Sequence, residues 1–502
     1  MPRLTLSMIV KNEEQHLREC LKTVEGIVDE IVIVDTGSTD STVEIAKEFG
    51  AKIFYFEWIK DFSAARNFGL SKSTGDWILI LDADDRLEEN SKKEILEKIK
   101  DNNNYGVRCI INSLDFEEAP TINKYTRLFR NDKNVSYSGK AHEQIEQSLV
   151  ENGYKIIDSS IEIVHHGYNV PRAELQKKAE RNLELLLKDY EERPTVYGAY
   201  QLANSYKLLD NREKTNFYAK KALFGNHLLK ELRSVCYLHI IDNEIVSGNL
   251  LAAKEVLDKA TYENKDHVQL NLVASQIYQQ LNENDKAINH CIKAYQNNLK
   301  IKKSKKNRNI LDILVDDKKI IYQGIFLSLT SSSLENLEYF LSQLSAISES
   351  EHRLFYNILQ NNKLIDKDID SLIKVITTNG LDLVLKLLEN SSNIEFKLEF
   401  YSKIYEKFNT SSKYLVSFGA FLISINQLNE AEVILKLSVD NTENNFSGLF
   451  YLASVYVQNK KYLELTELLS EADEKIDSHS IYYPKLQILK GKISPLINLA
   501  IT

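Results

Sequence analysis

The distribution of proline divides this chain of 502 residues into two parts with different structural preferences. Four of the six prolines lie within the first 194 residues, and none lies between Pro194 and Pro484. Because proline interrupts helices, so long a stretch without proline, rich in Leu, Lys, Glu and Asn, favours stacked helices. The sequence therefore predicts a mixed N-terminal part followed by an all-helical part.

The first part alternates short apolar runs with helix-like segments. Strands are predicted over residues 4–9, 31–34, 52–56 and 77–81, and helices over 13–24, from about 41 to 49, and over 63–71. Strands that alternate with helices indicate βαβ units and a parallel sheet buried on both faces. In such sheets ligands bind beyond the carboxyl ends of the strands.

The second part carries a periodic pattern. Small or apolar residues recur at one constant spacing, as in the pairs Ala253 and Ala287, Ala260 and Ala294, and Ala431 and Leu465. This spacing matches the period of about 34 residues that is typical of helix–turn–helix repeats of the tetratricopeptide kind. An unrelated helical bundle is the alternative, and it leaves the prediction of an all-α part unchanged.

Acidic residues follow two of the predicted strands. Asp82 and Asp84 come directly after the strand WILIL, and Asp35 follows the strand IVIV. Carboxylates on such a loop suit Mg²⁺ or Mn²⁺, which also binds substrate phosphates. Asp35 at a strand end can accept hydrogen bonds from a base or a ribose, while Gly37 permits the tight turn. The alternative is a solvated turn or helix cap, which Asp40 and Ser41 could form without Asp35.

Arg66 lies early in the helix that precedes the WILIL strand, within the stretch DFSAARN. A guanidinium at this place could hold a diphosphate with two hydrogen bonds. Taken alone, the segment favours the alternative, a surface arginine.

Four motifs in this order and spacing, SMIVKNEE, IVIVDTGSTDST, the DFSAARN stretch and GDWILILDADD, resemble family 2 glycosyltransferases of the GT-A fold. The resemblance implies a Rossmann-like α/β domain with a mostly parallel sheet. It also implies that Asp35 binds the uridine of a UDP-sugar, with Ile9, Val10 and Glu13 near the base. Three further donor-site residues are implied, namely Arg66, Asp82 and Ala83.

Two later segments fit the same family. RLFR, which contains Arg127, and GKAHE resemble its acceptor-side motif, and IVHHGY resembles its closing motif. The resemblance implies that Asp84 and His165 bind Mn²⁺ or Mg²⁺, with His166 as the alternative to His165, and that Arg127 contacts the donor. Family 2 enzymes invert the sugar by a single displacement that needs a base. Glu143 is the candidate base, and Asp85 and Glu118 are the alternates.

The predicted domains are a GT-A catalytic domain over residues 1–170, tetratricopeptide-like repeats over 171–300 and more degenerate repeats over 301–502. The whole resembles sublancin-type peptide glycosyltransferases, which implies transfer of a hexose to a Ser, Thr or Cys side chain of a polypeptide. Helical repeats provide concave surfaces suited to extended peptides. A lipid-linked or cell-surface glycan is the alternative acceptor, and a non-catalytic repeat scaffold is the second alternative.

Composition excludes other classes of protein. A formal net charge of −9 argues against a nucleic-acid partner, because phosphate neutralisation needs a basic surface. The four cysteines form no C-x-x-C pair, no run of 18 apolar residues occurs, and the start lacks a signal peptide. These features predict a soluble, cytoplasmic protein without a membrane span. A homodimer is compatible with the repeats.

Overall fold

The computed structural model describes residues 2–101, 103–113, 121–167, 172–225, 227–304, 309–440, 446–475, 483 and 486–493. The chain forms two compact units, Met1–Ile320 and Ile321–Thr502. The predicted domain boundary at residue 170 and the alternate base Glu118 lie outside the described residues. Residue 300 lies inside a described helix, Asn284–Lys303, and both boundaries stay predictions.

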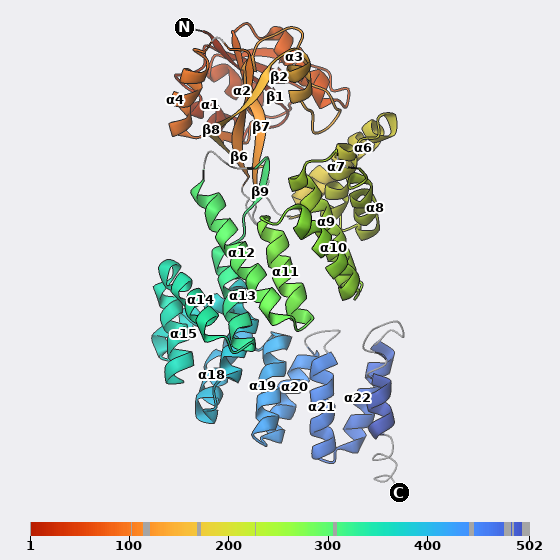
Figure 1. Ribbon diagram of the computed structural model, residues 1–502. Coiled ribbons are helices and arrows are strands. Elements are labelled where there is room, and N and C mark those ends of the chain that lie inside the picture. The colour runs from red at the N-terminus through yellow and green to blue at the C-terminus, as the bar shows by residue number, and fades with distance from the viewer. Residues whose placement is uncertain are drawn as a thin grey trace. The chain divides into compact units, whose positions relative to one another are not determined.

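The first unit begins with a nine-stranded sheet in the order β3-β2-β1-β4-β7-β6-β8-β5, with β9 paired to β7 (Figure 1). Strands β1 to β4 are mutually parallel, β7 is antiparallel to both β4 and β6, and β8 is parallel to β6. The prediction of an α/β domain that begins with parallel strands is confirmed. The strands are β1 (Leu4–Val10), β2 (Glu30–Asp35), β3 (Lys52–Tyr55), β4 (Trp77–Ile80), β5 (Asp85–Leu87), β6 (Tyr105–Ser113), β7 (Thr121–Arg130), β8 (Lys155–His165) and β9 (Leu311–Ile313).

Helices cover both faces of this sheet, because its central strands are apolar on both sides. In β4, Trp77 and Leu79 belong to one core with residues of α1, α2 and α4, whereas Ile78 and Ile80 belong to another with residues of α3 and α5. We call the sheet with these five helices the sheet domain. The helices are α1 (Leu17–Thr23), α2 (Thr42–Glu48), α3 (Phe62–Lys72), α4 (Glu89–Lys98) and α5 (Glu146–Glu151).

In the described residues of the first unit, seven helices follow α5, and consecutive helices pack in pairs such as α7 with α8 and α11 with α12. Ala253, Ala260, Ala287 and Ala294 are fully buried on α10 and α12, as the periodic pattern predicts. The helices are α6 (Arg172–Glu192), α7 (Val196–Leu208), α8 (Arg212–Ala222), α9 (Lys230–Val246), α10 (Leu250–Glu263), α11 (Val268–Gln280) and α12 (Asn284–Lys303).

The second unit is built from helices throughout its described residues. Ala431 on α20 and Leu465 on α22 are both fully buried, again at the spacing of the repeat. No helix in the described part of the chain is long and apolar enough to cross a membrane. The helices are α13 (Asp317–Thr330, which starts in the first unit), α14 (Leu334–Ile347), α15 (Glu349–Asn361), α16 (Ile369–Val375), α17 (Leu381–Glu389), α18 (Ile394–Phe408), α19 (Ser412–Ser424), α20 (Leu428–Asp440), α21 (Phe446–Gln458) and α22 (Tyr462–Lys475).

One strand lies in the part that the sequence predicts to be helical. Residues 311–313 form β9, which pairs with residues 121–123 of β7, and Lys124 donates its backbone N–H to the carbonyl of Ile310 at 2.9 Å. The chain that follows α12 is therefore hydrogen-bonded to a strand of the sheet domain.

Candidate active site

The acidic residues lie together at one edge of the sheet. Because β1 pairs in parallel with both β2 and β4, Val10, Asp35 and the loop after β4 leave the sheet at the same edge. Arg86 holds this loop, since its guanidinium donates to the carbonyls of Ala83 at 3.0 Å, Asp85 at 2.8 Å and, just before α1, His16 at 3.1 Å. The sequence analysis did not single out Arg86.

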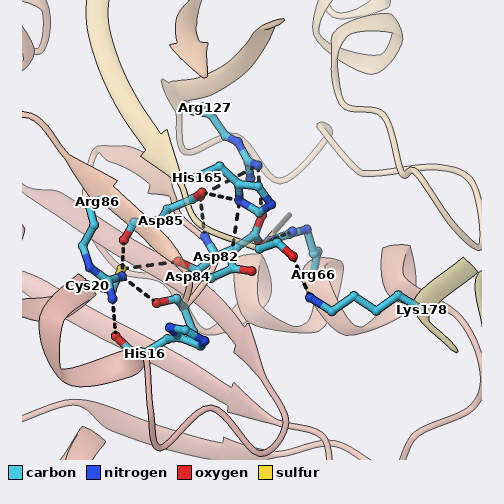
Figure 2. Close-up of polar contacts among 12 residues, drawn as sticks. His16, Cys20, Arg66, Asp82, Asp84, Asp85, Arg86, Arg127, His165 and Lys178 are labelled. Carbon is cyan, nitrogen blue, oxygen red and sulfur yellow. Dashed lines mark hydrogen bonds and ion pairs between the residues drawn. The ribbon is translucent and has the colours of Figure 1, made fainter. Parts of the chain in front are cut away.

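Asp82 is the centre of a cluster of paired charges (Figure 2). Its carboxylate accepts hydrogen bonds from Nη2 of Arg66 at 2.7 Å and Nη2 of Arg127 at 2.9 Å. Arg66, only 7% exposed, also donates from Nε to Oε1 of Glu143 at 2.5 Å. The fold thus brings together four residues that the sequence singled out, from α3, the loop after β4, β7 and the segment before α5.

Asp84, Asp85 and His165 form a second group, in which one possible ligand atom from each lies within 4.8 Å of the others. Nδ1 of His165 lies 2.9 Å from Oδ1 of Asp85 and 3.5 Å from Oδ1 of Asp84. Asp85 is fully buried, and its other oxygen accepts the backbone N–H of Asp82 at 2.9 Å. Both oxygens of Asp85 are therefore used within the protein, which leaves Asp84 and His165 to face a ligand.

Gly167 lies directly against this second group, where there is no room for a side chain. A Cβ at this position would lie 2.3 Å from Oδ2 of Asp84 and 2.6 Å from Nε2 of His165. Nε2 of His165 and Oδ2 of Asp84 thus converge on one place. If Nδ1 of His165 carries the proton and donates it to Asp85, Nε2 carries the lone pair. Carboxylates orient metal-binding histidines in this way. His166 donates its backbone N–H to the carbonyl of Asp84 instead.

The pKa values of Asp82 and Asp84 are shifted in opposite directions. Burial alone would raise the pKa of Asp82, but the charges of Arg127 and Arg66 outweigh it and lower the pKa below the usual range. Burial raises the pKa of Asp84, and His165 opposes this only in part. Burial would lower the pKa of His165, but its hydrogen bond to Asp85 and the charge of Asp84 raise it. An oxygen–nitrogen pair with this excess of negative charge fits a divalent ion.

Asp35 and Glu13 lie at the same edge, on the side of β2. The Asp35 carboxylate, 3% exposed, accepts the backbone N–H of Gly37 at 3.2 Å and of Ser38 at 3.1 Å, so it fixes the turn that Gly37 permits with a φ of +103°. Asp40 accepts the backbone N–H of Thr42, the first residue of α2. Burial and the nearby charge of Asp84 raise the pKa of Glu13 to about 7.

Val10 and Ala83 belong to the apolar core on one face of the sheet, and Ile9 pairs with Val34 of β2. The carbonyl of Val10 accepts the N–H and the hydroxyl of Thr36, each at 3.0 Å, and Ala83 is buried.

Two side chains from the helices after the sheet domain also reach this region, and the sequence analysis missed both. Lys178 on α6 donates to the carbonyl of Gly167 at 2.9 Å. The hydroxyl of Tyr197 on α7 accepts hydrogen bonds from Nε2 of Gln144 at 3.1 Å and of Gln201 at 2.8 Å, and Gln144 is next to Glu143 in sequence. A charged or aromatic residue in a long helix gives no sign in the sequence of what lies opposite it.

Residues 5–148 match the family model described as "Glycosyl transferase family 2". This part of the chain is therefore a family 2 glycosyltransferase domain, which confirms the resemblance seen in the four motifs.

Relatives extend the similarity into the helices. The TPR repeat-containing protein Synpcc7942_0270 of Synechococcus elongatus is 34% identical over 201 residues, which cover 38% of this chain and 50% of that protein. The SPbeta prophage-derived glycosyltransferase SunS of Bacillus subtilis is 28% identical over 263 residues, which cover 50% of this chain and 59% of SunS. The chain thus spans about half the length of the curated relatives it matches. The crystal structure of S. aureus TarS, at 15% identity, aligns over 53% of each chain with a TM-score of 0.28.

Proposed function

We propose that the chain is a metal-dependent glycosyltransferase that moves a hexose from a UDP-sugar to a polypeptide side chain. The observation that carries the proposal is the convergence of Asp84 and His165 beside the paired acid Asp82, at the carboxyl ends of parallel strands. The family 2 match over the same part of the chain supports transfer of a sugar from a nucleotide.

For the donor, Asp35 would hold the uridine, with the main chain of Ile9 and Val10 and the side chain of Glu13 beside the base. Asp82, Ala83, Arg66 and Arg127 would line the ribose and phosphate side. The support is their common edge of the sheet and the hydrogen bonds that lock Asp82 between the two arginines. A locked carboxylate keeps its orientation when the donor arrives, so little ordering energy is spent on binding.

Asp84 and Nε2 of His165 would hold Mn²⁺ or Mg²⁺, with Asp85 orienting the imidazole. When bound, the ion neutralises charge on the departing diphosphate. Glu143 would take the proton of the acceptor nucleophile as this attacks the sugar, because its second carboxylate oxygen is not engaged by Arg66. Asp85 suits that role less well, since both of its oxygens are used within the protein.

A polypeptide acceptor is supported by the resemblance to sublancin-type peptide glycosyltransferases and by the helical pairs that follow the sheet domain. The polar surroundings of Tyr197 and Gln144, beside Glu143, could bind peptide groups through hydrogen bonds. A lipid-linked or cell-surface glycan is the alternative acceptor.

The first test measures hydrolysis of UDP-glucose, UDP-galactose and UDP-N-acetylglucosamine by the purified full chain with Mn²⁺. We expect turnover of one donor, and its loss in Asp84→Ala. Asp266→Ala, which replaces an exposed aspartate of the repeats, is the matched control and should retain wild-type turnover. Equal hydrolysis by wild type and Asp84→Ala would show that the metal assignment is wrong.

The second test addresses the acceptor and the base. Pooled peptides containing Ser, Thr and Cys are incubated with the intact UDP-sugar that the first test identifies as the donor, and intact mass reports addition of one hexose. Glu143→Gln should lower this transfer by about 10²-fold or more, the range for loss of a general base, while UDP still binds. Modification of glycan acceptors but of no peptide would favour the alternative.

A further inference from the structure

The ammonium group of Lys178 reaches the acidic site from outside the sheet domain. Nζ donates to the carbonyl of Gly167 at 2.9 Å, and Gly167 is the residue whose Cα borders Asp84 and His165. Figure 2 shows the side chain extending from its helix toward this cluster. Among the described residues Nζ makes no other hydrogen bond, so two of its three N–H groups remain available.

The helix that carries Lys178 is packed against the sheet domain. Leu185 and Leu186 of α6 share an apolar cluster with Trp58, Phe62 and Ala141. At two further points of α6, Glu184 pairs with Lys60 at 2.8 Å, and Glu192 pairs with Lys140 at 2.5 Å. Because α6 packs on the sheet domain at several points, the backbone position of Lys178 is fixed. The side chain is therefore held within reach of the site.

The charges of the site leave a place for one more cation. Arg66 and Arg127 together offset the charges of Asp82 and Glu143. A metal-binding His165 is neutral, so the charges of Asp84 and Asp85 are left over. A divalent ion at Asp84 offsets the charges of Asp84 and Asp85 and no more. A sugar diphosphate adds further negative charge. Arg66 and Arg127 can offset this charge only in part, because both are already hydrogen-bonded to Asp82.

We propose that Lys178 binds the diphosphate of the nucleotide-sugar donor, so that the first helix behind the sheet domain completes the donor site. The inference rests on the proposed use of a nucleotide sugar as donor. Without donor the ammonium holds the carbonyl of Gly167, and with donor its free N–H groups donate to phosphate oxygens. The exposure of Lys178 leaves it open to such a ligand.

The test measures binding of UDP by isothermal titration calorimetry to the full chain in the presence of Mn²⁺. Lys178→Met keeps the length of the side chain and removes the charge, and it should weaken UDP binding about tenfold or more, as expected for a lost charge-assisted hydrogen bond. Lys177→Met, at the adjacent exposed lysine, is the matched control and should bind UDP as wild type does. Uridine, which has no phosphate, should bind all three proteins equally.

Each other outcome has a definite meaning. Equal affinity of wild type and Lys178→Met for UDP would overturn the inference. So would a lower free energy of unfolding of ligand-free Lys178→Met, with affinity for uridine reduced as much as for UDP, because that result indicates a structural role. Failure of the wild type to bind any of UDP, GDP and ADP would instead contradict the proposed donor class, and the inference with it.

Discussion

Replacing Asp82 by asparagine should destabilise the metal-free protein, whereas the same replacement at Asp84 should stabilise it. The two carboxylates are close in sequence, but only Asp82 is hydrogen-bonded to guanidinium groups. Asp84 is partly buried beside other acids, and Nδ1 of His165 lies 3.5 Å from its carboxylate.

The size of the effect at Asp82 follows from its two hydrogen bonds. Bonds between charged groups contribute about 1.5–3 kcal/mol each, and breaking a buried ion pair by removing one partner costs about 3–5 kcal/mol. Because the Asp82 side chain is 29% exposed, we expect the lower end of this range, a loss of about 3 kcal/mol. Most of this loss comes from Arg127, whose other acidic neighbour, Asp85, is 3.9 Å away, whereas Arg66 keeps its hydrogen bond to Glu143.

The two replacements should also differ in their dependence on pH. The folded-state pKa of Asp82 is lowered, so its stabilisation is complete above the unfolded-state value of about 3.9 and disappears as pH falls further. The folded-state pKa of Asp84 is raised, so its charge destabilises the fold at neutral pH and this penalty is relieved as pH falls through the raised value. The gain in Asp84→Asn should therefore be largest at neutral pH and vanish in acid.

Tryptophan fluorescence in a urea titration with EDTA measures both effects. The two tryptophans of the chain, Trp58 and Trp77, lie in the sheet domain, so the signal reports that domain even if the helical unit unfolds separately. Each variant serves as the control for the other. A loss below about 1 kcal/mol in Asp82→Asn, or equal losses in both variants, would refute the reasoning, since breaking a buried pair must cost more than that.

Three further predictions concern the second group. Asp85→Asn should weaken Mn²⁺ binding by about tenfold or more, measured by calorimetry, because the imidazole loses its orienting carboxylate; unchanged affinity would exclude that role. Gly167→Ala should abolish Mn²⁺-dependent donor hydrolysis with the fold retained by circular dichroism, because its Cβ would lie 2.3 Å from Oδ2 of Asp84; wild-type hydrolysis would contradict the site's geometry. Mn²⁺ affinity should fall by up to about tenfold per pH unit below the raised pKa of His165, since protons compete for its ring nitrogen; a flat profile from about pH 8 to 5 would exclude the imidazole as a ligand.

The parts of the fold that the sequence predicts are those set by local patterns. Strands β1 to β4 are short apolar runs closed by polar turns, and the acidic loop after Ile80 follows from the end of its own strand. The period of the repeats likewise arises within each pair of helices. Local signals of this kind survive in the folded chain because packing agrees with them.

The parts that the sequence does not predict depend on partners far along the chain. β7 alternates more exposed with buried residues, and its antiparallel pairing with both β4 and β6 depends on strands that lie far from it in sequence. β9 is a short strand, Leu311–Ile313, and exists because β7 offers an unpaired edge. The partners of Asp82 lie 16 and 45 residues away in sequence, so no local pattern reveals them.

The position of α6 brings side chains of α6 and α7 to the site of the sheet domain. β8 ends at His165, which is part of the second group, and α6 begins at Arg172, a short distance later in the chain. A helix that starts so close to the site and packs on Trp58 and Phe62 must run past it, and its length then brings α7 with Tyr197 to the side of Gln144. The sheet domain alone therefore lacks two of the side chains that line its own site, and a truncation before α6 should lose ligand contacts as well as stability.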